Sequence, residues 1–244
     1  MHRTWVTAAL LAIAACGGGN DTPSTDAPAA IDAATDSGAA IDAGSDGRPV
    51  SGRLLPLAVG NTWTYDVTPA GGAAVAKTST VQAFEDIGGD KAGIMAYRVR
   101  TEKIDGATVS WQADTGTAVV RHREQVFDLT ATMTSEQYYN PSKLRVDDAP
   151  AHTAQGATWT DAYTELTRNV ATNVVTTIPK SETWTVEATA ESVTVPAGTF
   201  LCIRLHRTGA AGAADKRYWF SPGVGKIKEV DVASTEELRS YTLH

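Results

Sequence analysis

The stretch TWTYDV, residues 62–67, decides the fold class because its side chains alternate in character with a period of two. Trp63, Tyr65 and Val67 occupy one face of an extended chain, and the threonines and the aspartate between them occupy the other. The stretch TWTVEAT, residues 183–189, repeats this alternation. Such a period in segments rich in threonine, valine, tryptophan and tyrosine predicts half-buried antiparallel strands.

Turn signals separate similar segments from residue 53 to the end of the chain. The dipeptide Asp105-Gly106 between two alternating runs favours a two-residue hairpin. Further turns are predicted at residues 69–72, 88–89, 140–141 and 222–223. We count ten to twelve strands and no long amphipathic helix. Residues 53–244 are therefore predicted to form one all-β domain, an antiparallel and strongly curved sheet or (half-)barrel.

Residues 1–15 have the features of a secretory signal peptide. Arg3 supplies a positive charge, and residues 5–15 are apolar or small in a run too short to cross a bilayer as a helix. Residues 13–16, Ile-Ala-Ala-Cys, resemble the lipobox of bacterial lipoproteins, in which two small residues precede a cysteine. In that family the thiol is joined to diacylglycerol and becomes the new N-terminus. The resemblance implies that Cys16 anchors the chain to a membrane.

Residues 16–52 are predicted to be the lipidated cysteine and a disordered tether. The segment from Gly17 to Val50 consists almost wholly of small residues, proline and aspartate, with six aspartates and one arginine. This composition cannot bury enough apolar surface to offset the entropy of ordering. Gly17 follows the cysteine, whereas an aspartate there often retains similar lipoproteins at the inner membrane. The resemblance therefore implies the cell envelope and favours its outer membrane.

Three segments of the domain resemble a group of uncharacterised bacterial envelope proteins, many of them lipoproteins. VPAGTF at residues 195–200 precedes YWFSPGVG at residues 218–225, and PLAVGNTWTY at residues 56–65 matches the start of that domain. The group is distantly similar to curved-sheet lipoprotein carriers, which hold acyl chains against a concave face. This resemblance implies a fold and leaves the function open. The same residues also fit turns, with Gly223 supplying a positive φ in a type II turn.

A short echo links two distant segments of the domain. GNTWT at residues 60–64 resembles GATWT at residues 156–160, and in each a glycine precedes a strand that begins with a tryptophan. The spacing of 96 residues suits a domain built from two halves. On so short a match, duplication and chance remain open alternatives.

The sequence contains no motif for catalysis, a cofactor or a metal. G-x-S-x-G, H-E-x-x-H, C-x-x-C and a phosphate loop are all absent, and no two histidines of the domain have ligand spacing. Cys202, the remaining thiol once Cys16 carries lipid, is predicted to be buried and inert. The net charge of −7 and the lack of a basic groove exclude nucleic acid as a partner. We therefore expect no enzyme, no catalytic residues, no cofactor and no metal.

Two functions remain open, with a hydrolase as the least favoured third. The first is a binding or carrier module for an apolar ligand or an envelope protein, and the second is a structural or scaffolding lipoprotein with a filled core. An empty inner face favours the first, and a packed one favours the second. The candidate ligand-lining residues are the large aromatic side chains expected on inward faces: Trp63, Tyr65, Trp111, Trp159, Trp184 and Trp219.

The Cys16→Ser substitution should release the protein from the membrane fraction or block its processing, because serine cannot accept the diacylglycerol. The wild-type chain should partition into the detergent phase. Cell fractionation followed by immunoblotting measures both outcomes. Cys202→Ser is the matched control, since it leaves the lipobox intact and should stay at the membrane. A Cys16→Ser chain that is still cleaved and still partitions into the detergent phase like the wild type would contradict the anchor.

Overall fold

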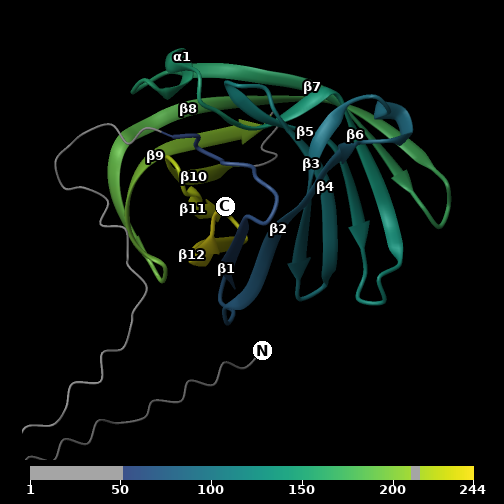
Figure 1. Ribbon diagram of the computed structural model, residues 1–244, viewed down its shortest axis with the longest axis horizontal. Helices are drawn as coiled ribbons and strands as arrows, with labels where there is room; N and C mark the ends of the chain where they lie inside the picture. Colours follow the sequence, from purple (N-terminus) through teal and green to yellow (C-terminus); the bar gives the residue numbers. More distant parts are fainter. Residues whose placement is uncertain (1–51, 210–214) are drawn as a thin grey trace, which may run out of the picture. The chain divides into compact units, whose positions relative to one another are not determined.

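The strands form a closed antiparallel barrel in which each strand pairs with its neighbours along the chain and β1 pairs with β12 (Figure 1). The computed structural model describes residues 52–209 and 215–244. The strands are β1 (Thr62–Pro69), β2 (Val75–Asp86), β3 (Met95–Lys103), β4 (Gly106–Asp114), β5 (Ala118–Phe127), β6 (Met133–Asp147), β7 (Thr158–Asn169), β8 (Val175–Val195), β9 (Gly198–Gly209), β10 (Lys216–Ser221), β11 (Gly225–Asp231) and β12 (Ser234–Thr242). The predicted all-β, antiparallel and strongly curved fold is confirmed.

Helical structure is limited to two short segments of the described residues, the 3-10 turn η1 (Gly89–Lys91) and α1 (Pro150–Thr153). No helix in this part of the chain is long and apolar enough to cross a membrane. The predicted signal peptide of residues 1–15, the anchor Cys16 and the tether as far as residue 51 lie outside the described residues.

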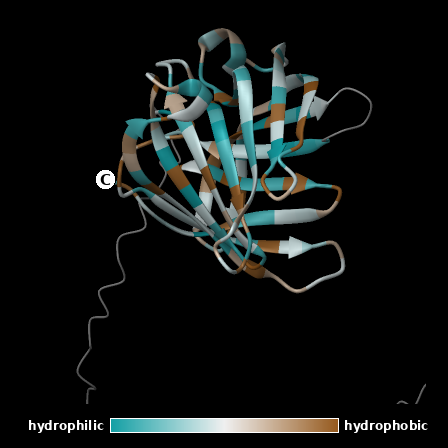
Figure 2. Ribbon diagram, turned by 90° about the vertical axis from the view of Figure 1, so that its right-hand side faces the viewer, coloured by the Kyte–Doolittle hydropathy of each residue, from teal (hydrophilic) through white to brown (hydrophobic). Residues whose placement is uncertain are grey.

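Hydrophobic and hydrophilic residues are interspersed along the strands (Figure 2), and burial alternates along the first part of β1. In β1, Trp63 and Tyr65 are buried, with 3% and 4% of their surfaces exposed. Trp63 lies opposite Ser79 of β2, and Tyr65 lies opposite Lys77, so these four side chains share the inner face. The inward position of the two aromatic side chains therefore follows from the period of two.

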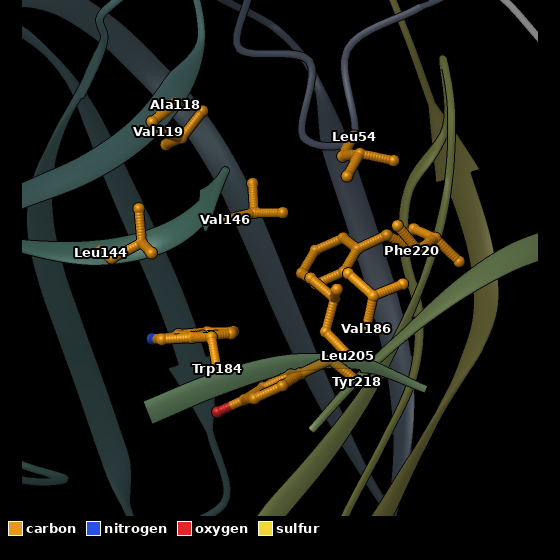
Figure 3. Close-up of a cluster of buried hydrophobic side chains, with 11 residues drawn as sticks. Leu54, Ala118, Val119, Leu144, Val146, Trp184, Val186, Leu205, Tyr218 and Phe220 are labelled. Atoms are coloured by element: carbon orange, nitrogen blue, oxygen red, sulfur yellow. The ribbon is translucent and has the colours of Figure 1, made fainter. Parts of the chain in front are cut away.

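One apolar core joins strands that are far apart in the sequence (Figure 3). Leu54, in the coil before β1, packs among side chains of β5, β6, β8, β9 and β10. Trp184 is 1% exposed and stacks on Tyr218, with 5.6 Å between the ring centroids. The cluster comprises Leu54, Ala118, Val119, Leu144, Val146, Trp184, Val186, Ile203, Leu205, Tyr218 and Phe220.

A second apolar core joins the two C-terminal motifs. The hairpin between β8 and β9 packs Val195 and Phe200 into the cluster that holds Trp219 of β10. The backbone N–H of Ala197, in the hairpin turn, donates to the Leu238 carbonyl of β12 over 2.9 Å. Trp219 and Phe220 belong to different cores, as expected for adjacent residues of one strand. The motif residues therefore have a packing role.

The structure confirms the predicted turn at residues 222–223, places the hairpin loop at 105–106 one residue earlier and contradicts the turn at 140–141. Val224 N–H donates to the Ser221 carbonyl over 3.0 Å, and Gly223 has a φ of 78°, as predicted for a type II turn. The hairpin at Asp105-Gly106 is present, but Lys103 pairs with Gly106, so the loop lies one residue earlier. The turn predicted at residues 140–141 is wrong, because β6 continues through them as an irregularity in its pairing with β5.

The GxTWT echo extends into the backbone hydrogen bonds. Gly60 N–H donates to the Val81 carbonyl over 2.9 Å, and Gly156 N–H donates to the Val186 carbonyl over 3.0 Å. Each valine N–H returns a bond of 2.9 Å to the carbonyl of the residue after the glycine. The strand registers then shift after Val81 and after Val186. Strands β1 and β2 therefore enter the barrel in the same way as β7 and β8.

The correspondence continues through the later strands of each half. The register between β4 and β5 shifts after Trp111, and that between β10 and β11 shifts after Trp219. Arg123 lies over the Trp111 ring, and Lys228 lies over the Trp219 ring. Beside each shift, two residues three positions apart in the sequence form an ion pair, namely Arg121–Glu124 and Lys226–Glu229. So many matching features favour duplication of a six-stranded unit over a chance echo.

Candidate ligand-binding site

A cavity of about 550 Å³ lies inside the barrel. Its wall is formed by inward residues of β1 to β6 and β10 to β12 and by the coil before β1. The order of residues along the strands defines two ends: Leu57 and Trp63 lie at one, and Pro69, Lys103 and Ile104 lie at the other. Lys103 and Ile104 are exposed. The cavity therefore opens near the β3–β4 turn, and its volume suits a small molecule.

Lysines and glutamates of β2, β10, β11 and β12 form a network on one side of the cavity. Lys226 bridges Glu229 and Glu236, with 2.6 Å between its Nζ and Oε2 of Glu236. Lys77 pairs with Glu236 from β2, and Lys216 Nζ lies 2.8 Å from Oε1 of Glu229. These five side chains hold the β10–β12 segment to β2 across the β1 strand.

The network determines the protonation of its members. Burial raises the pKa of the Glu229 and Glu236 carboxyls, but the attraction of Lys226 outweighs it, so both pKa values lie below the ordinary value. Burial lowers the pKa of Lys77 to about 8, with repulsion from Lys226 as the next cause. Burial also raises the pKa of Tyr65, whose hydroxyl donates to the Lys226 carbonyl over 3.1 Å. At neutral pH the wall therefore carries both carboxylates and a protonated Lys226.

The opposite side of the cavity is formed by β4, β5 and β6. Arg121 pairs with Glu124, both from β5, and Gln112 donates to Ser110 over 2.9 Å in β4. Arg145 of β6 also lines the cavity, but it forms no ion pair or side-chain hydrogen bond within residues 52–209 and 215–244. This side therefore presents one paired and one unpaired arginine.

A second charged cluster lies between β6 and β9, beside the first core. Glu182 accepts a hydrogen bond from the Tyr163 hydroxyl over 3.1 Å and lies 3.4 Å from Arg207 Nη1. Lys143 Nζ lies 3.8 Å from Oε1 of the same carboxylate, and burial lowers the pKa of this lysine to about 8. Glu182 thus accepts hydrogen bonds from Tyr163 and Arg207 and forms an ion pair with Lys143, which ties β6, β7, β8 and β9 together.

A second cavity, of about 420 Å³, adjoins β5, β6 and β7. Its buried carboxylate, Glu136, lies 2.7 Å from Arg168 Nη2 and accepts bonds of 3.0 Å from Arg123 Nε and Gln125 Nε2. Because the carboxylate is surrounded by donors from the chain itself, this cluster is a structural connection between strands.

The structure separates the six aromatic residues proposed as ligand-lining. Trp63 and Tyr65 line the large cavity. Trp111 lies on the other face of β4 from Gln112, with the Arg123 guanidinium 4.5 Å from its ring. Trp159 and Trp184 belong to the first core and Trp219 to the second. The structure thus brings two of the six to one site.

Sequence reasoning missed the charged residues of the wall. The signal for Lys77 was present, because it alternates in β2 with Ser79 and Val81, which share the inner face. Lys226 had no such signal in the sequence. The register between β10 and β11 shifts beside it, so the period of two does not tell which face of β11 its side chain occupies.

Other reactive residues have structural surroundings. Cys202 is 1% exposed, and burial raises the pKa of its thiol to about 12, as expected for an inert cysteine. His152 Nδ1 lies 2.8 Å from Asp147, and His206 Nε2 lies 2.6 Å from Asp215. Across the described ranges, no three His, Cys, Asp or Glu side chains gather as a metal-binding cluster.

No protein-family model and no curated protein matches the sequence. The chain is similar in structure to a predicted lipoprotein from Parabacteroides distasonis, at 12% identity and a TM-score of 0.38, over 79% of this chain and 100% of that chain. It is also similar to a predicted exported protein with a YmcC-like fold from Bacteroides fragilis, at 13% identity and a TM-score of 0.36, over 78% of this chain and 98% of that chain. The terms lipoprotein and exported protein describe those two proteins.

The Glu229→Gln substitution should weaken the barrel at neutral pH and flatten its response to acid. Because the pKa of Glu229 in the folded state lies below 4.5, its stabilisation is present above about pH 4.5 and is lost as the pH falls toward the folded value. We expect a loss of about 3 kcal/mol in the free energy of unfolding at pH 7, since a buried cation loses a partner. Urea unfolding at several pH values measures both effects.

Glu237→Gln is the control for this substitution. Glu237 pairs with Lys228 and is 35% exposed, so its loss should cost less than about 1 kcal/mol. Equal losses for the two variants, with equal acid dependence, would show that the buried network does not stabilise the barrel.

Proposed function

We propose that the chain is a bacterial envelope lipoprotein, anchored through Cys16 at the outer membrane, whose barrel binds one small molecule in its lumen. The observation that carries this proposal is the cavity of about 550 Å³ with a mouth at the β3–β4 turn. A wall that combines apolar side chains with a few fixed polar groups is typical of ligand sites. The protein would then act as a binding or carrier module without a reaction of its own.

The wall favours a ligand of mixed character. Leu57, Val99 and Phe220 supply apolar contacts, and Arg121 and Arg145 supply charged groups of the same lining. A wholly apolar ligand would take the charged groups out of water without replacing their hydrogen bonds, at a cost of several kcal/mol. We therefore replace the apolar ligand expected from the sequence by an amphipathic one.

A scaffolding role would use a different part of the molecule. Exposed apolar side chains occur in the β7–β8 turn and in the first residues of β8, namely Val170, Val174, Val175 and Ile178. A scaffold needs such a surface for a partner protein and has no need for a cavity. The two functions are distinguished by blocking the lumen while leaving the hairpin intact.

The Ser79→Phe substitution should block ligand binding, because Ser79 lines the cavity at the level of Trp63. The probe is 1-anilinonaphthalene-8-sulfonate, an amphipathic aromatic anion, titrated into the whole chain carrying Cys16→Ser without detergent. We expect saturable fluorescence enhancement with one site, and roughly tenfold weaker binding or more in Ser79→Phe, from lost space and contacts.

Thr78→Phe is the matched control for the blocked lumen. Thr78 is the preceding residue of β2 and faces away from the cavity, with its hydroxyl 3.1 Å from that of Thr64. It should bind the probe as the parent chain does. Absence of saturable binding in the parent chain, or equal binding by Ser79→Phe and Thr78→Phe, would contradict a lumenal site.

A further inference from the structure

We propose that Arg145 binds a carboxylate or phosphate group of the molecule held in the lumen. This inference rests on the proposed function and adds the chemical class of the ligand and the residue that recognises it. The ligand would be an amphipathic anion, with its charged group at Arg145 and its apolar part along the cavity wall.

Arg145 is set apart from the other cations of the wall by its lack of a carboxylate partner. Lys77, Arg121, Lys216 and Lys226 each pair with a glutamate. Lys103 lies exposed at the mouth, where water can solvate it. In the described part of the chain, Arg145 forms no ion pair, and its buried Nε has no hydrogen-bond partner. A guanidinium can donate five hydrogen bonds, so this group has unused binding capacity.

A β-bulge directs Arg145 into the lumen. Val119 pairs with Val146 and Val120 pairs with Leu144, so the register between β5 and β6 shifts at Arg145 and leaves it without a cross-strand partner. Leu144 and Val146, on either side, are both packed in the first core (Figure 3). Bulges re-aim side chains and are frequent beside functional sites. The backbone of Arg145 is therefore held on both sides while its side chain faces the cavity.

The surroundings of Arg145 favour an anion. Burial lowers the pKa of Arg145, and the next cause is repulsion from Arg121. Glu229 attracts it, but that carboxylate is already bound by Lys216 and Lys226. An arginine remains charged in proteins even when its pKa falls, so an unpaired one carries a desolvation cost that a bound anion relieves.

The charge of the whole lining agrees with this local imbalance. The cavity wall has more cationic than acidic side chains, although the chain as a whole carries a net charge of −7. A positive cavity in an acidic protein attracts anions selectively. The six cations are Lys77, Lys103, Arg121, Arg145, Lys216 and Lys226, and the four acids are Asp105, Glu124, Glu229 and Glu236.

Two probes that differ by one anionic group test the proposal. 1-Anilinonaphthalene-8-sulfonate and N-phenyl-1-naphthylamine share the same ring system, and the former carries a sulfonate. Arg145→Gln, in the whole chain with Cys16→Ser, should bind the sulfonate roughly tenfold more weakly or worse, because a charge-assisted bond is lost. Its affinity for the neutral amine should change less than about twofold. Arg239→Gln, at a side chain that is 58% exposed, is the control and should alter neither affinity.

Competition on the unsubstituted binding site gives an independent measurement. Decanoate and decyl phosphate should displace the bound sulfonate at lower concentrations than decan-1-ol, and the order of the two anions tells whether a carboxylate or a phosphate suits the site. Equal displacement by all three would overturn the role of Arg145 even if Arg145→Gln failed to fold.

The outcomes separate the two proposals. If the neutral amine binds saturably and Arg145→Gln affects both probes alike, the lumen remains a ligand site and Arg145 is only structural. If neither probe binds the parent chain, the lumenal function and the anion site both fail. Thermal unfolding supplies a further criterion. Removing an unpaired, half-buried charge should leave the melting temperature unchanged or raise it, whereas loss of a structural arginine would lower it.

Discussion

A ring of twelve strands encloses more space than its inward side chains fill, and the rest of this structure depends on how that space is divided. Side chains just fill the interior of barrels of about eight strands, whereas wider ones enclose cavities or channels. Here the coil before β1 contributes Leu54 to one core, and the β8–β9 hairpin contributes Phe200 to another. What remains is a cavity of about 550 Å³ with charged and apolar walls.

The charged wall is difficult to explain by stability alone. Well-packed apolar residues can replace a buried ion pair with little loss or even a gain in stability. The Lys226 network offsets its desolvation by mutual pairing, since it brings Glu229, Glu236 and Lys77 together. Arg145 has no such compensation among the described residues. An unpaired arginine at this position therefore fits a binding role, in which the ligand supplies the missing partner.

Much of the fold, and little of the site, could be predicted from the sequence. The period of two correctly placed Trp63 and Tyr65 on the inner face, because the pairing of β1 with β2 has no register shift between these two residues. Trp111 and Trp219 have the same pattern but adjoin shifts, and apolar clusters cover their faces of the sheet. Closure of β1 on β12 joins segments near opposite ends of the domain, which local patterns do not encode. The position of Arg145 depends on that closure and on a bulge.

The most direct measurement is a crystal structure of the protein with decanoate at saturating concentration. The account predicts one decanoate in the lumen, with its carboxylate oxygens about 3 Å from the Arg145 guanidinium and its alkyl chain against the apolar wall. The Lys226 network should keep the same pairs. A lumen that holds only water, or a carboxylate bound elsewhere while Arg145 pairs with the chain itself, would contradict it.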